Sequence, residues 1–191
     1  HDQYQNYLKN LTDKLEKESS TKLNESFNMP KISMILIIDD QNFDDIRNTI
    51  DSIKIQTYEN WQLIIFSRNS SPNVSKINEL IEKDNPKIIY CGELSETSFQ
   101  TIFNFNGDLI GLISSGIQLS KFALAQFIKE SNQFPNSEIF YSDHDYLDEN
   151  NKQVNPFFKP DWSPYLFRSN DYLSPFYVMT KTILKKINSN L

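Results

Sequence analysis

Two aspartates follow the most apolar stretch of the chain. Asp39 and Asp40 come directly after the run Ile32–Ile38, which is rich in β-branched residues and is typical of a buried parallel strand. Ligands of α/β proteins bind at the carboxyl ends of such strands, so both carboxylates are candidate binding residues. Acidic side chains also cap the helix that follows a strand, and capping is the alternative interpretation of this pair.

A second acidic motif, Asp143-His144-Asp145, stands near an acidic turn. Alternate side chains of an extended segment point to one face, so Asp143 and Asp145 could share a divalent cation such as Mg²⁺ or Mn²⁺. A solvated or loop-capping turn is the other interpretation, because the segment runs on into Asp, Glu and Asn. Between two carboxylates, His144 is expected to have a raised pKa, which would make it a poor neutral ligand or base.

Composition excludes several classes of protein. The 191 residues suit one domain with a sizeable core, and 19 basic against 25 acidic residues give a net charge of −6, opposite in sign to a nucleic-acid footprint. Four glycines are too few for a dinucleotide or phosphate loop, and nothing indicates an organic cofactor. With two histidines, a nucleophilic triad would depend on His144. The single cysteine, Cys91, adjoins an apolar run and is predicted to be a core thiol.

Apolar periodicity divides the chain into an N-terminal segment, 1–29, and an α/β domain, 30–191. Tyr4, Leu8, Leu11 and Leu15 lie on one stripe of an amphipathic helix, and a linker is expected at about 18–29. Beyond Pro30, apolar runs alternate with helical patterns, which predicts a mostly parallel sheet flanked by helices. The expected strands are 32–38, 61–66, 87–91, 109–113 and 139–142, and the expected helices cover 43–53, 74–81, 101–105, 119–131 and 181–187.

The segment after residue 151 is rich in proline and aromatic residues, which predicts an ordered stretch that wraps the domain. It contains Lys159, Asp161 and Trp162. A buried Trp beside such charged groups typically pins a loop, so a structural role is expected for all three. The longest apolar run is far shorter than a membrane span, and a cytoplasmic location is expected, peripheral to a membrane only through a longer protein.

Several stretches, in this order and spacing, resemble family 2 glycosyltransferases. They are residues 30–33, 49–53, 56–65, 141–148, 156–164 and 170–173, so the likeness covers about 30–187. The resemblance implies a GT-A fold, in which the carboxyl ends of the strands hold a nucleotide-sugar donor. It also implies inverting transfer of the sugar to a hydroxyl of a glycan acceptor, in polysaccharide or glycoconjugate synthesis.

The chain departs from the family pattern at three loops. Asp39 and Asp40 replace a proline followed by an aromatic residue and an asparagine, and Ser67 and Arg68 stand where the family has paired aspartates. Arg68 could instead meet a phosphate. Ser114 and Ser115 occupy the place of the Asp-x-Asp metal motif, and hydroxyls are poor ligands for Mg²⁺ or Mn²⁺. The candidate donor-binding residues are therefore Asp39, Asp40, Ser67, Arg68, Ser114 and Ser115.

The resemblance places the catalytic base downstream of the segment that matches 180–187, so it is expected beyond Leu191 and in a further domain of a longer chain. Two hypotheses follow. The first is a glycosyltransferase donor domain, with Arg68 and helix N-terminal amides beside the diphosphate in place of a metal. The second is a degenerate module that binds or scaffolds within a larger glycan-assembly protein.

Overall fold

A computed structural model describes residues 2–20, 27–39, 42–68, 74–81, 86–95 and 98–188. The chain forms two compact units. One contains His1–Phe27 and Ser142–Tyr172, and the other contains Asn28–Tyr141 and Leu173–Leu191. The domain predicted over 30–191 thus contains nearly all of the second unit and the 142–172 part of the first.

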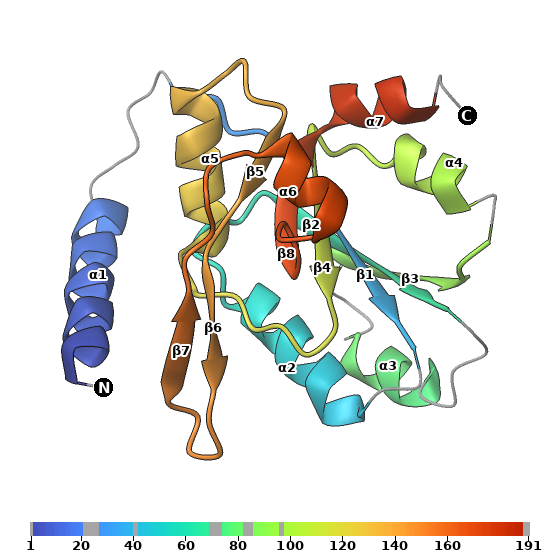
Figure 1. The fold of residues 1–191 in the computed structure, drawn as a ribbon. Coiled ribbons are helices and arrows are strands. Elements are labelled where there is room, and N and C mark those ends of the chain that lie inside the picture. The colour runs from blue at the N-terminus through green and yellow to red at the C-terminus, as the bar shows by residue number, and fades with distance from the viewer. Residues whose placement is uncertain are drawn as a thin grey trace. The chain divides into compact units, whose positions relative to one another are not determined.

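The second unit is built on a six-stranded sheet with the order β3-β2-β1-β4-β8-β5 (Figure 1). Strands β1 to β4 run parallel, which confirms the predicted parallel core of the sheet. Strand β8 lies antiparallel between β4 and β5, a pairing that the sequence pattern did not predict. The strands are β1 (Ile32–Ile38), β2 (Trp61–Ser67), β3 (Ile88–Glu93), β4 (Leu109–Ser114), β5 (Ile139–Tyr141) and β8 (Phe176–Thr180).

Helices cover both faces of this sheet (Figure 1). Apolar side chains of α2, α3 and α5 join the larger core cluster on one face, and those of α4 and α7 join the smaller cluster on the other. A strand buried on both faces needs mostly apolar residues, which explains the nearly continuous apolar run in β1. The helices are α2 (Phe43–Lys54), α3 (Val74–Leu80), α4 (Ser98–Asn104), α5 (Ala123–Gln133) and α7 (Lys181–Asn188).

Helix α5 starts at Ala123, four residues after the predicted start at 119. The Leu119 N–H donates to the Ser52 side chain on α2, and the Ser120 carbonyl accepts from the Gln56 side chain just after α2. The helical spacing of apolar residues therefore begins before the helix does, in a segment whose backbone is bonded to other parts of the fold.

The first unit consists of α1 (Asp2–Ser20), the hairpin of β6 (His144–Leu147) and β7 (Gln153–Phe157), and α6 (Pro164–Ser169). Helix α1 confirms the predicted amphipathic helix, although it extends into the expected linker, of which residues 21–26 lie outside the described part. The sequence pattern predicts an acidic turn at 143–151, but residues 144–147 of it form β6 and only 148–151 close the hairpin. There, Asp148 Oδ1 accepts from the N–H groups of Asn150 and Lys152, both at 2.9 Å. None of the described helices combines the length and the apolar character of a membrane span.

Candidate functional site

Three adjacent strands of the second unit end together at one edge of the sheet. In the register, Ile38 of β1 lies beside Ser67 of β2, and Ile37 lies beside Ser114 of β4. Paired strands are about 4.8 Å apart. The candidate residues that follow β1, β2 and β4 therefore leave the sheet side by side, as their positions after apolar runs predict.

Asp39 carries an unpartnered carboxylate oxygen at this edge. The side chain is half-buried, and Oδ1 is buried without a hydrogen-bond partner in the described part of the chain. Asn42 caps α2, since its Oδ1 accepts from the Asp44 N–H at 3.2 Å, so Asp39 does not cap that helix. A buried acceptor left without a partner is costly, which makes Asp39 Oδ1 a candidate contact for a ligand donor group. The predicted site residue Asp40 lies outside the described residues.

Ser67 and Arg68 end the neighbouring strand. Ser67 is buried, and its Oγ lies 3.0 Å from the Tyr90 hydroxyl on β3. Arg68 is exposed, and its backbone N–H donates to the Ile38 carbonyl at 2.7 Å, which places the backbone of Arg68 next to the end of β1. The sequence analysis missed Tyr90, although a tyrosine on the next predicted strand, near the strand end, is a usable signal for a hydroxyl at this edge.

Ser114 and Ser115 leave the sheet from β4. Ser114 is exposed and its N–H donates to the Pro175 carbonyl at 3.2 Å, whereas Ser115 Oγ is buried and has no partner among the described groups. The chain then turns at Gly116, whose φ of +85° suits glycine. A Cβ placed on Gly116 would lie 3.8 Å from Cβ of Asp45 on α2, so an acidic helix residue that the sequence analysis did not select lies beside this turn.

The described residues at this edge do not fit a divalent metal ion. No group of three or more His, Cys, Asp or Glu side chains that could hold a metal occurs in the described ranges. Hard divalent cations prefer several carboxylate or carbonyl oxygens, whereas the described residues at this edge offer the carboxylate of Asp39, that of Asp45 beside the Gly116 turn, and neutral hydroxyls. The orphaned oxygens of Asp39 and Ser115 are instead suited to hydrogen bonds with an organic or phosphate ligand.

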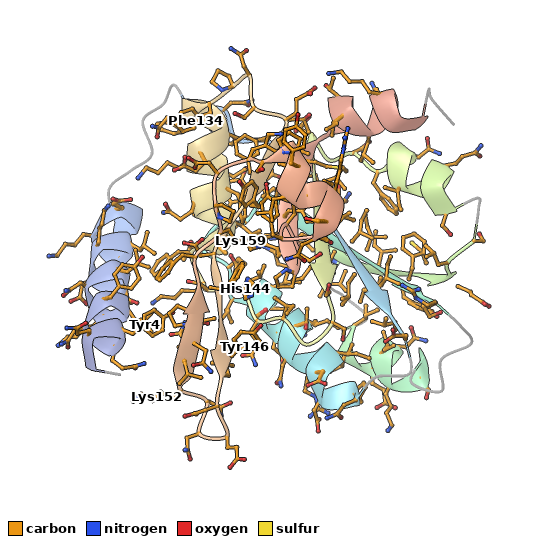
Figure 2. The ribbon with its side chains drawn as sticks, viewed as in Figure 1. Tyr4, Phe134, His144, Tyr146, Lys152 and Lys159 are labelled. Atoms are coloured by element: carbon orange, nitrogen blue, oxygen red, sulfur yellow. The ribbon has the colours of Figure 1, made fainter. Side chains whose placement is uncertain are left out.

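The other acidic motif lies in the first unit, and its carboxylates are engaged by protein donors. Asp143 Oδ1 accepts from the Lys159 N–H at 2.7 Å. Asp145 Oδ2 accepts from the Tyr4 hydroxyl at 2.5 Å and from the Gln153 side-chain amide at 2.9 Å. Figure 2 shows Tyr4 on α1 and His144 on the hairpin. These bonds favour the structural interpretation of Asp143 and Asp145 over a shared cation.

His144 differs from the expectation in its ionisation. Its pKa lies below the usual value, mainly because of burial and then because of the Lys159 charge, which together outweigh the two neighbouring carboxylates. The expected rise was therefore wrong, since the sequence neighbours suggested only the carboxylates. The imidazole stacks on the Phe157 ring with 5.1 Å between centroids, and Nδ1 is buried without a partner in the described residues.

Four further residues are expected from the sequence to have structural roles: Cys91, Lys159, Asp161 and Trp162. Burial raises the pKa of the Cys91 thiol, which lies against the smaller core cluster and is suited to packing more than to reactivity. Trp162 is 54% exposed, contrary to the expected burial, and contacts Phe167 and Tyr172 with centroids 5.3 and 6.4 Å away. Lys159 is half-buried, and burial lowers its pKa, whereas Asp161 is exposed.

Sequence comparison finds one relative with a descriptive name. The chain is 29% identical over 164 residues to the O-antigen biosynthesis protein RfbC of Myxococcus xanthus, which covers 83% of this chain and 13% of that protein. The chain thus spans a small part of the length of this curated relative. No protein-family model matches the chain.

Comparison of folds gives the architecture. A complex of TarS from S. aureus with UDP superposes with a TM-score of 0.62 and 12% identity, covering 83% of this chain and 49% of that one. The mannosyltransferase PcManGT of Pyrobaculum calidifontis, in complex with GDP-Man and Mn²⁺, gives a TM-score of 0.57 and 11% identity, covering 90% and 51%. Together with the mostly parallel sheet flanked by helices, these matches show that the chain has the GT-A fold of glycosyltransferases.

Proposed function

We propose that this chain is the donor-binding part of a family 2 glycosyltransferase, which holds a nucleotide sugar at the carboxyl ends of β1, β2 and β4. The observation that carries the proposal is a pair of buried oxygens at this edge, Asp39 Oδ1 and Ser115 Oγ, which have no hydrogen-bond partner among the described residues. Buried polar groups of folded proteins nearly always have partners, so two of them at the ligand-binding edge of an α/β sheet favour a polar ligand there.

The residues at the edge divide naturally between the parts of such a donor. Asp39 Oδ1 is an acceptor suited to the hydroxyl or N–H groups of a nucleoside. Arg68 is an exposed cation whose planar guanidinium suits a diphosphate, and the Ser114 and Ser115 hydroxyls can donate to phosphate oxygens. Positive charge close to the departing diphosphate is the contribution that this chain would make to catalysis, by stabilising the negative charge that develops there.

The reaction we propose is transfer of the sugar, with inversion, to a hydroxyl of a glycan acceptor during polysaccharide or glycoconjugate synthesis. The name of the Myxococcus relative, an O-antigen biosynthesis protein, supports this class of product. Because the chain spans 13% of that relative, we propose that other parts of a longer protein supply the acceptor site and the catalytic base. A cytoplasmic location stays a prediction.

Thermal unfolding with a panel of nucleoside diphosphates and nucleotide sugars, each in EDTA or with Mn²⁺, tests the proposal. Ligand at a hundred times its dissociation constant stabilises the folded chain by about 2.7 kcal/mol. For a chain of this length that raises the unfolding midpoint by roughly 5–10 °C. We expect such a shift in EDTA for at least one nucleotide. A shift that appears only with Mn²⁺ would instead indicate that a metal ion takes part in donor binding.

A second candidate function follows from the serines after β4. Ser114 and Ser115 replace the carboxylates that the resemblance leads one to expect, which favours a degenerate module with a binding or scaffolding role. That function predicts a cooperatively folded chain whose unfolding midpoint no nucleotide shifts. A second, complete glycosyltransferase domain in the full-length protein would also support it.

A further inference from the structure

We infer that three buried polar side chains, those of Thr49 and Ser52 on α2 and of Gln56 just after it, are positioning residues that set the conformation of residues 115–122 and so present Ser115 to the donor. The inference rests on the proposed function for the donor, but the contacts themselves belong to the fold. Thr49 and Ser52 are three residues apart and so lie on one face of α2, and Gln56 follows the C-cap Ile55. All are buried, with exposed fractions of 0%, 6% and 6%.

Thr49 ties the helix to the turn directly after Ser115. Its Oγ1 accepts from the Gly116 N–H at 3.0 Å and donates to the Asp45 carbonyl at 3.0 Å. The hydroxyl therefore has one partner on its own helix and one on the loop. Because Gly116 is the residue next to Ser115, this bond restricts the direction in which the chain leaves β4.

Ser52 and Gln56 continue the same pattern along the loop. Ser52 Oγ accepts from the Leu119 N–H at 3.0 Å and donates to the Thr49 carbonyl at 2.7 Å. The Gln56 side chain donates to the Ser120 carbonyl at 2.8 Å and accepts from the Leu124 N–H at 3.0 Å. Backbone groups at both ends of an irregular segment are thus satisfied by side chains of α2 and of the residue just after its C-cap.

This arrangement explains how a loop without regular structure holds one conformation. Backbone groups that are shielded from water require partners. In residues 115–122 the Gly116 and Leu119 N–H groups obtain theirs from α2, and the Ser120 carbonyl obtains one from Gln56. Leaving such an amide unsatisfied costs more free energy than the bond itself contributes. Substituting one of these side chains by an apolar one should loosen the loop at the amide that it serves.

Amide hydrogen exchange of the free chain tests the positioning role without any ligand. In Thr49→Val we expect the Gly116 amide to exchange roughly five- to tenfold faster, and in Ser52→Ala the Leu119 amide to do the same. Thr49→Ser keeps the hydroxyl and should restore slow exchange. Asn48→Ala, on the exposed side of the same helix, is the matched control and should change neither amide. Unchanged exchange in both Thr49→Val and Ser52→Ala would overturn the inference.

Titration with the nucleotide that stabilises the wild-type chain tests the consequence for the site. We expect Thr49→Val and Ser52→Ala to bind it about five- to tenfold more weakly, with affinity recovered in Thr49→Ser and unchanged in Asn48→Ala. A loosened loop with wild-type affinity would overturn the link to Ser115 while leaving the proposed function intact. If the wild-type chain binds no nucleotide, the proposed function fails, and the link to the donor fails with it.

Discussion

The backbone N–H of Arg68 donates to the carbonyl of Ile38 at 2.7 Å, which joins the first residue after β2 to the last residue of β1. Asp39 follows Ile38 directly, so a carboxylate oxygen without a described partner and an exposed guanidinium leave the sheet from adjacent positions. Opposite charges at one strand edge suit a ligand with both polar hydrogens and phosphates.

Replacing Arg68 should weaken nucleotide binding without affecting the fold. A hydrogen bond to a charged group contributes about 1.5–3 kcal/mol, so Arg68→Ala should lower the affinity for a nucleoside diphosphate by tenfold or more. The side chain is exposed, and the unfolding midpoint should stay within about 1–2 °C of wild type. Calorimetric titration measures the affinity, and Lys185→Ala, an exposed lysine on α7, controls for the loss of one charge. Equal affinities in both variants would remove Arg68 from the site.

Replacing Asp39 should weaken nucleotide binding without lowering the stability of the fold. Because its Oδ1 is buried without a described partner, Asp39→Ala removes a costly group and should leave the unfolding midpoint unchanged or raise it. The same substitution should lower the affinity for nucleotide roughly tenfold. A marked drop in the unfolding midpoint would assign Asp39 a structural role. Thermal unfolding of the variant with and without nucleotide distinguishes a structural role from a binding role.

Gly107 should tolerate no side chain. A Cβ at this position would clash with Oγ of Ser33, which is fully buried on β1, and would lie 2.9 Å from the Leu109 carbonyl oxygen. Overpacking of this kind costs about 2–3 kcal/mol, so Gly107→Ala should lower the unfolding midpoint by roughly 4–12 °C. Gly92→Ala meets no atom within 4 Å but has a φ of +86°, and should cost only about 1–2 kcal/mol. Thermal unfolding measures both variants, and a midpoint of Gly107→Ala at or above that of Gly92→Ala would contradict the clash.

His144 should make the first unit less stable in acid. Its folded pKa is lowered, so the unfolded chain binds more protons between the folded value and the usual 6.5. The stabilising contribution of the neutral imidazole is complete above pH 6.5 and is lost as the pH falls through the folded pKa. In His144→Gln the unfolding midpoint should depend less on pH between the folded pKa and 6.5. Proton NMR gives the pKa directly, since the only other histidine is His1, and a value above 6.5 would contradict the burial argument.

Much of the sheet could be predicted because a strand buried on both faces needs a nearly continuous apolar run, as in Ile32–Ile38 and Trp61–Phe66. The position of Asp39 at the carboxyl end of β1 followed from the same pattern. The insertion of β8 between β4 and β5 could not be predicted, because it depends on pairing across more than thirty residues of sequence. The pKa of His144 was missed for a similar reason, since Phe157 and Lys159 reach it only in the folded hairpin.

The central claim, that a nucleotide sugar binds where β1, β2 and β4 end, is tested most directly by hydrogen exchange of the wild-type chain with its stabilising nucleotide in EDTA. We expect slower exchange at residues 38–39, 67–68 and 114–116, with little change in the hairpin of β6 and β7. Protection confined to the hairpin around Asp143 and Asp145, or protection that appears only with Mn²⁺, would contradict the claim. Absence of protection at every residue would leave the scaffolding function.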